Sequence, residues 1–302
     1  MASLDDIRLL TQGVSDPGVL AELRGAVDHN YGLLLMASGR NDESISYFDT
    51  SIEHQEQRLK ESGDPGSLLG GFLNTVSTRG LAYTRLGDVR RARADFTRAI
   101  SIAEGYDRPL QAADVRRPLG SLELRTGDVP IALRLFEESE RTYRGHGLEV
   151  PPLLRLEQAQ ALMTAGLADE AGRHLDEVLP VMKARHSTNR ELGGVELFRA
   201  SAALMVDDLE LARRWATSAR RRMLRMGCQT CVADATIIGL HADVRDALRT
   251  RDSQSVLPVR VLRAAKAMPP RLTEQAGLAR MLATRLEIAR GKLKRAAELL
   301  AQ

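Results

Sequence analysis

One short pattern returns along the chain at intervals of about 40 residues. In each copy a small residue inside a helical stretch is followed by a Gly-Asp-like turn, then by Ala, and then by a large apolar residue. The clearest copy is RGLAYTRLGDVRRARADFTRAI, which has Gly80, Gly87, Asp88, Ala92 and Phe96 in these places. Because self-similarity at a fixed period is the mark of a repeat array, the chain is not expected to form one ordinary globular core.

Six copies keep this register. Their turn residues are Gly39, Gly87, Gly127, Gly166, Asp207 and Gly291. The last interval is about twice the others, so the sequence predicts one more turn, near residues 249–252. Each copy supplies two helices, and the chain therefore contains about seven helical hairpins.

The pattern has a physical reason. A small residue such as Gly80 lets the first helix of a hairpin lie close to the second, and Phe96 fills the space between hairpins. Gly87 ends the first helix in a left-handed conformation, and Asp88 caps the second by accepting from a free backbone N–H. The period exceeds the roughly 34 residues of a tetratricopeptide repeat. We predict an all-α, tetratricopeptide-repeat-like, right-handed superhelical solenoid.

The spacing also predicts a layout for the chain. Residues 1–15 form an N-terminal capping helix, and residues 16–302 form the repeat array. The hairpins are expected at about 17–60, 70–105, 110–146, 151–186, 190–226, 229–267 and 271–302. Pro118 falls inside the first helix of the third hairpin, where it either kinks that helix or delays its start.

Composition agrees with helices and argues for a soluble protein. Hydrophobic residues make up 43% of the chain and aromatic residues only 4%, which leaves few of the residues that strands prefer. The acidic N-terminus does not resemble a signal peptide. The longest apolar run, Leu33 to Ala37, is far shorter than the roughly 20 residues of a membrane-spanning helix. We expect a cytoplasmic protein.

The stretch from Gly80 to about Asp243 resembles the N-terminal repeat region of actinobacterial CHAT proteins. The resemblance rests on LGSLELRTGDVPIALRLFEESERTY, on LLRLEQAQALMTAGLADEAGRHLDEVLP and on ARRWATSARRRMLRMG. In that family the repeats precede a caspase-like protease domain with a His/Cys dyad. The resemblance implies that this chain is the sensing or docking half of such a system, with a caspase-like protease domain as a possible partner.

No arrangement of residues in the sequence indicates catalysis. The six histidines are scattered over different repeats, and no phosphate-binding glycine loop is present. Cys228 and Cys231 form a CxxC pair without the further ligands that a structural zinc site needs. Small apolar packing on one helical face is the favoured interpretation of these two cysteines, with redox sensing and a metal site as alternatives. We expect no enzyme activity, no metal and no cofactor.

A run of arginines marks the fifth hairpin. It consists of Arg213, Arg214, Arg220, Arg221, Arg222 and Arg225. These residues wind around a helix instead of forming one stripe, whereas phosphate binding favours cations gathered on one face. A solvated helix with local acidic partners is the favoured interpretation, and nucleic acid is an unlikely partner.

The remaining candidate site is the inner face of the array, where tetratricopeptide proteins hold their partners. The register places two groups of residues there. The polar group is Asn74, Arg85, Asp114, Arg117 and Arg125, and the apolar group is Leu156, Met163 and Leu204. The guanidinium group of an arginine can bind a carboxylate through two parallel hydrogen bonds, so the first group suits an acidic segment. The second group suits an apolar helix.

The sequence therefore favours a non-catalytic scaffold or sensor module whose groove binds a protein or peptide. The alternatives are the regulatory half of a CHAT protease system and a nucleic-acid-binding repeat protein.

Overall fold

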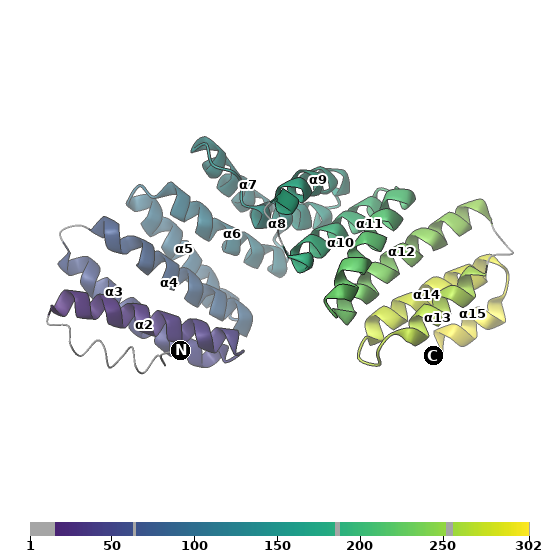
Figure 1. Cartoon of the computed structure of the whole chain (residues 1–302), viewed down its shortest axis with the longest axis horizontal. Coiled ribbons are helices and arrows are strands. Elements are labelled where there is room, and N and C mark those ends of the chain that lie inside the picture. The colour runs from purple at the N-terminus through teal and green to yellow at the C-terminus, as the bar shows by residue number, and fades with distance from the viewer. Residues whose placement is uncertain (1–15, 63–64, 185–187, 252–255, 302) are drawn as a thin grey trace. The chain divides into compact units, whose positions relative to one another are not determined.

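The computed structural model describes residues 16–62, 65–184, 188–251 and 256–301. These residues form 14 α-helices and no strand (Figure 1). Their contacts divide the chain into two compact units, Met1–Val150 and Pro151–Gln302, which we call unit 1 and unit 2. The capping helix predicted for residues 1–15 lies outside the described residues.

The described residues of unit 1 form three antiparallel helical pairs. The pairs are α2 (Pro17–Ala37) with α3 (Asn41–Glu61), α4 (Pro65–Leu86) with α5 (Val89–Gly105), and α6 (Pro109–Thr126) with α7 (Val129–Gly145). We call the first helix of each pair helix A and the second helix B. Helix α4 packs against α2 on one side and α6 on the other, so the A helices form a layer.

Unit 2 continues with eight described helices. They are α8 (Pro152–Thr164), α9 (Ala168–Ala184), α10 (Asn189–Met205), α11 (Leu209–Arg225), α12 (Gln229–Thr250), α13 (Leu257–Ala267), α14 (Thr273–Ala289) and α15 (Leu293–Leu300). Helix α13 packs mainly on α14, whereas α12 packs on α10, α11 and α14. Side chains of α12 to α15 meet in one apolar cluster. The succession of helices that pack on their neighbours supports the predicted tetratricopeptide-like helical repeat fold.

The turns follow the predicted pattern at the level of the backbone. All six predicted turn residues have a positive φ, including the non-glycine Asp207. Helix α12 ends at Thr250, and Arg251 takes the left-handed conformation there. The carboxylates of Asp88, Asp128 and Asp208 cap α5, α7 and α11 by accepting from the backbone N–H three residues later. The sequence prediction of glycine turns and aspartate caps is thus confirmed.

A close contact between glycine and phenylalanine holds each pair of unit 1 together. A side chain at Gly80 would place its Cβ 2.7 Å from the Phe96 ring, and one at Gly120 would place it 2.6 Å from the Phe136 ring. Both rings are completely buried. Gly32 and Phe48 make the same contact in the first pair. The phenylalanine therefore lies directly on the glycine of its own hairpin.

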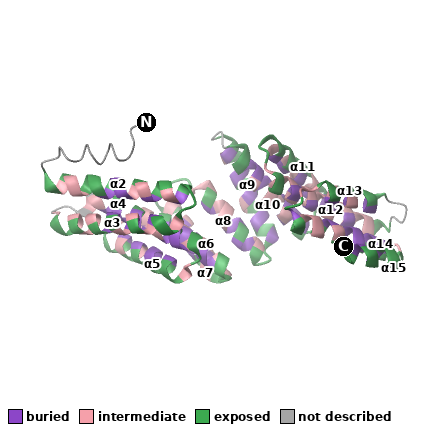
Figure 2. Ribbon diagram, turned by 90° about the horizontal axis from the view of Figure 1, so that it is seen from below, coloured by how far each residue is buried: buried purple, intermediate pink, exposed green. Residues whose placement is uncertain are grey.

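Buried residues concentrate where neighbouring helices face each other (Figure 2). Arginine ion pairs connect successive helices at the edges of this core. Arg79 of α4 donates to both carboxylate oxygens of Asp95 at 2.6 and 2.8 Å, and also to Asp49 of α3 at 2.6 Å. Arg93 of α5 donates to both oxygens of the buried Glu123 of α6 at 2.6 and 2.7 Å.

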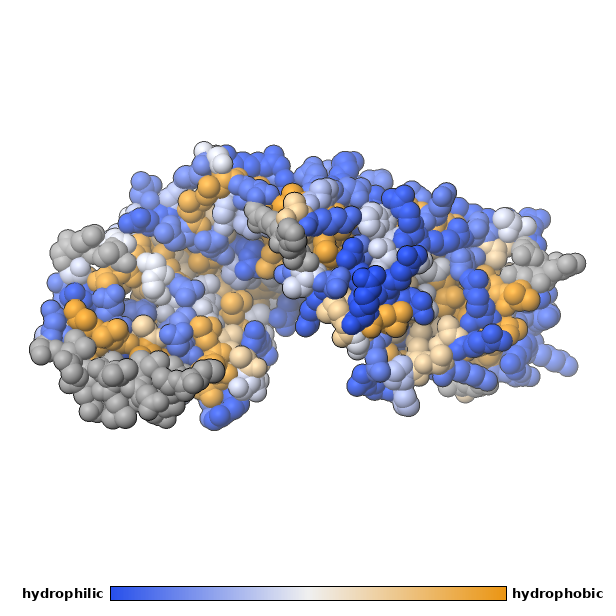
Figure 3. Space-filling view, in the orientation of Figure 1, coloured by the Kyte–Doolittle hydropathy of each residue, from blue (hydrophilic) through white to orange (hydrophobic). Residues whose placement is uncertain are grey.

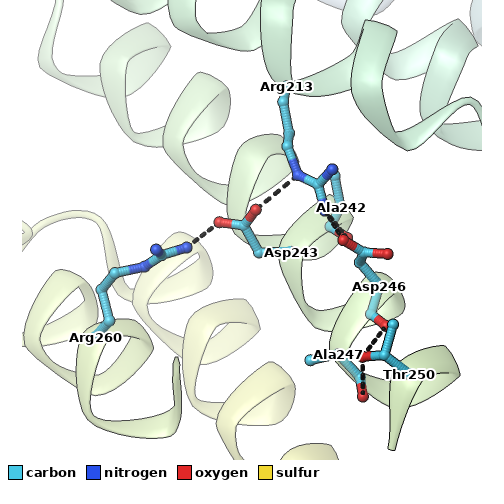
Figure 4. Close-up of polar contacts among 7 residues, drawn as sticks. All are labelled: Arg213, Ala242, Asp243, Asp246, Ala247, Thr250 and Arg260. Carbon is cyan, nitrogen blue, oxygen red and sulfur yellow. Dashed lines mark hydrogen bonds and ion pairs between the residues drawn. The ribbon is translucent and has the colours of Figure 1, made fainter. Parts of the chain in front are cut away.

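Unit 2 contains a similar arginine connection, which Figure 4 shows. Arg213 of α11 lies between two carboxylates of α12, donating to Asp243 at 2.7 Å and to Asp246 at 2.7 Å. Arg260 of α13 pairs with the other oxygen of Asp243. A single carboxylate thus joins three helices.

Pro118 does not delay the start of α6. The helix begins at Pro109 and continues through Pro118 to Thr126, so the late-start alternative is wrong. Pro118 is buried in the interior of the helix.

Replacing Gly120 with Ala is expected to lower the free energy of unfolding by about 1–3 kcal/mol, because the added methyl group must displace the buried Phe136 ring. Gly71→Ala is the matched control, since Gly71 is exposed in the same layer of helices and has open space around it. Alanine loses less conformational freedom on folding than glycine, so this control should be about 0.5–1 kcal/mol more stable. Urea unfolding measures both changes, and an equal gain in the two variants would contradict the packing model.

Candidate functional site

One face of α4 and α6 is left uncovered by their B helices. Its solvent-facing residues recur every three or four positions, with buried residues between them. We call this surface the inner stripe; it consists of Asn74, Ser77, Leu81 and Arg85 on α4 and Asp114, Arg117, Ser121 and Arg125 on α6. Leu81 is its one apolar member, so the stripe presents mainly hydrogen-bonding and charged groups.

At its first end the stripe is held by a histidine of α2. The Thr75 hydroxyl donates to the Gly71 carbonyl at 3.0 Å, so it accepts from His29 Nδ1–H at 3.1 Å. The Asn74 amide then donates to His29 Nε2 at 3.3 Å. This pattern assigns the neutral Nδ1–H tautomer to His29, and burial lowers the pKa of the ring. Sequence reasoning missed His29, because nothing in its own helix marks it as a partner of α4.

Arg85 has a second role that the sequence did not reveal. Its Nη1 donates to the carbonyl of Met36 at 3.0 Å and thereby caps the C-terminal end of α2. In unit 2 Arg245 donates in the same way to the carbonyl of Leu204 at 2.6 Å. Arg85 nevertheless remains an exposed residue.

On α6 the charged members of the stripe have different surroundings. Asp114 accepts from the hydroxyl of Tyr143 on α7, and burial together with this bond raises the pKa of Tyr143. Arg117 is half-buried and close enough to Tyr143 to oppose that rise. Arg125 is exposed at the end of the helix. The single carboxylate of the stripe is therefore already engaged within the chain.

The three arginines of the stripe do not lie at the same height along the helix axes. Two chain reversals make α4 and α6 parallel, and Arg85 and Arg125 each stand two residues before a turn glycine. These two guanidinium groups therefore belong to the same end of the stripe. Arg117 is two helical turns away from Arg125, which corresponds to about 12 Å along the axis.

The apolar group predicted for unit 2 is only partly accessible. Leu156 and Met163 are half-buried on α8. Leu204 is 8% exposed and packs with Leu209 and Ala242, because α10 contacts both α11 and α12 at this position. Leu204 is therefore a core residue and does not line an open surface.

The two cysteines are joined by a disulfide. Both are half-exposed at the start of α12, so they are not the packed apolar thiols that the sequence suggested. Among the described residues no cluster of three or more His, Cys, Asp or Glu side chains could hold a metal ion. None of the helices described is both long and apolar enough to cross a bilayer.

Two members of the arginine run have acidic partners within the chain. Arg213 pairs with Asp243 and Asp246, as described above, and Arg222 donates to the buried Glu196 at 3.0 Å. Figure 3 shows hydrophilic side chains beside apolar patches on unit 2 and no single uninterrupted polar face in that view. The expectation of local acidic partners is confirmed for these two arginines.

Residues 77–106, which include the end of α4 and all of α5, match the model of the tetratricopeptide repeat. No curated protein matches the chain. Among solved structures, BtubC (BKLC) from P. vanneervenii is similar with 15% identity and a TM-score of 0.61, over 74% of this chain and 88% of that chain.

Two further solved structures cover more of the sequence. The apo form of RapI has 13% identity and a TM-score of 0.61, over 91% of this chain and 98% of that chain. The Rap conjugation gene regulator of the plasmid pLS20, solved in complex with the Phr* peptide, has 15% identity and a TM-score of 0.57, over 95% and 80% of the two chains. These likenesses show a shared tetratricopeptide-like fold.

Acidification is expected to weaken unit 1 through His29. In the folded protein the pKa of the His29 ring lies below the ordinary value of 6.5. The stability that the neutral ring contributes is therefore complete above pH 6.5 and is lost as the pH falls below that value. Protonation would also place a hydrogen on Nε2, which could then no longer accept from the Asn74 amide. His29→Gln should therefore reduce the loss of unfolding free energy between about pH 7.5 and pH 5.5. His146→Gln, at an exposed position, is the control; an equal reduction in both variants would count against this assignment.

Proposed function

We propose that this chain is a non-catalytic scaffold that binds a protein or peptide, with the inner stripe of unit 1 as the docking surface for an acidic segment. The observation that carries the proposal is the charge of the stripe. It holds three arginines and one carboxylate, and that carboxylate, Asp114, already accepts from Tyr143. The stripe therefore has an excess of positive charge that an acidic partner would neutralise.

The chemistry of the stripe suits an extended segment. A guanidinium fork binds a carboxylate through two parallel hydrogen bonds, which supplies both energy and orientation. Ser77 and Ser121 offer hydroxyl groups that can pair with the backbone of such a segment. From Asn74 to Arg85 the stripe runs about 16 Å along α4. That length accommodates about five residues of extended chain.

The comparisons support the class of partner. One protein of similar fold was solved in complex with a peptide. On unit 2, Leu156 and Met163 of α8, with the half-exposed Leu153 beside them, are proposed as a separate apolar surface for a helix.

A second candidate is the regulatory half of a CHAT caspase-like protease system. It rests on the resemblance of residues 80–243 to the repeat region of that family. Co-purification of the chain with a caspase-like protein tests this candidate, and the stripe variants below show whether the same surface is used.

Arg85→Glu combined with Arg125→Glu is expected to weaken binding of a labelled Glu-rich peptide by about tenfold or more, because both forks at one end of the stripe are reversed in charge. Arg90→Glu with Arg134→Glu, two exposed arginines on the B helices α5 and α7, gives the same change in net charge elsewhere. Fluorescence anisotropy at two salt concentrations measures both. An equal loss in the control pair would indicate a general charge effect and would rule out the stripe as the site.

A further inference from the structure

The CxxC pair occupies a defined position in unit 2. Cys228 is the N-cap of α12, and Cys231 lies three residues later in the first helical turn. Their Cα atoms are 5.5 Å apart, which is the usual separation across a disulfide. Both side chains are half-exposed. These are the only cysteines in the chain, so any exchange partner must come from outside it.

Three other helices of this chain show what the N-cap position does. In α5, α7 and α11 it holds an aspartate, whose side chain accepts from the backbone N–H of the third helical residue at 3.0, 3.3 and 3.0 Å. In α12 the same position holds Cys228, and the third helical residue is Cys231. No side-chain hydrogen bond caps α12 while the sulfurs are joined. Reduction would free the Cys228 sulfur to accept from the Cys231 N–H as a thiolate, in the place of the aspartates.

A pocket lies beside the pair, and arginines are found at it and near it. Gly227, Gln229 and Val232, which flank the two cysteines, line a largely apolar pocket of about 480 Å³ between α11, α12 and the end of α13. Arg220 also lines this pocket, and Arg271 donates to Gln229 at 2.5 Å.

Charged residues of α11 and α12 lie close to the pair in the sequence. Arg225 lies in the last turn of α11, three residues before Cys228, and Asp234 of α12 is the nearest acid along that helix. Asp234 accepts from the Gln275 amide at 3.0 Å. Cys228 is thus a partly exposed thiol at a helix N-terminus, with Arg225 three residues before it, and such a setting favours the thiolate.

We infer that Cys228 and Cys231 form a thiol–disulfide exchange site, with Cys228 as the nucleophile and Cys231 as the resolving thiol, that reacts with thiols and disulfides carried by small molecules or proteins. This inference concerns unit 2 and does not depend on the peptide-binding stripe of unit 1.

The exchange is balanced in both atoms and electrons. The Cys228 thiolate attacks one sulfur of a disulfide RSSR, forms a Cys228–SR bond and releases RS⁻. Cys231 then loses its proton to solvent and attacks the Cys228 sulfur, which expels the second RS⁻ and closes the protein disulfide. Two electrons pass from the protein dithiol to RSSR, and two RSH result after protonation. Reduction by thiols is the reverse.

The roles of the two thiols are tested with matched single variants. In Cys231→Ser the remaining Cys228 should be alkylated by iodoacetamide with a midpoint pH at least about one unit below the ~8.5 of a free cysteine. In Cys228→Ser the remaining Cys231, which is not at the cap, should titrate at a higher pH. Only Cys231→Ser should accumulate a mixed disulfide with oxidised glutathione rapidly. Equal midpoints, or faster reaction of Cys231, would overturn the assignment of Cys228.

The native protein provides a second, independent test. Reduced and oxidised glutathione in varied ratio should reduce and reoxidise the pair in the folded protein, at rates within about tenfold of those in urea, as expected for an accessible disulfide. A disulfide that glutathione reduces only in urea would overturn the proposal. Cys228→Asp, which restores the cap found in α5, α7 and α11, checks that the position tolerates an anion, because this variant should be at least as stable as Cys228→Ser.

Discussion

The contact between a glycine of helix A and a phenylalanine of helix B is the constraint on which unit 1 depends. A ring completely buried on a bare backbone fixes how closely the two helices approach and how they are rotated about their axes. That rotation decides which residues of α4 and α6 face solvent. The inner stripe, with its arginines and serines, is therefore a consequence of where Phe96 and Phe136 rest. A larger residue beneath either ring would alter the surface as well as the core.

The repeat register could be predicted from the sequence because its main determinants are local. A glycine with a positive φ, an aspartate cap and an apolar residue at helical spacing each depend on residues within a few positions of one another. This is why the turns at Gly87, Gly127 and even Asp207 fall where the pattern indicates. The positions of the small residue and the phenylalanine were also predictable, since they recur at constant separation. Their direct contact was not, because the pattern had assigned the phenylalanine to the space between hairpins. The division of the chain into two compact units was not, because it arises from contacts among many residues.

Side chains that reach a neighbouring hairpin escaped sequence reasoning. His29 meets Asn74 and Thr75 across more than 40 residues, and Arg85 reaches the carbonyl of Met36. Such partners depend on how helices of different hairpins are placed, which no periodicity encodes. Leu204 illustrates the same point, since one extra neighbouring helix turns an apparent surface residue into a core residue.

Pro118 in the interior of α6 has a consequence for the backbone of the inner stripe. Proline has no N–H group, so the carbonyl oxygen of Asp114, four residues earlier, loses the donor that a regular α-helix would supply. The partner of this carbonyl must therefore come from outside the regular i to i+4 ladder of the helix. The third helix A of unit 1 is thus continuous from Pro109 to Thr126, yet it lacks one rung of its hydrogen-bond ladder beside the stripe.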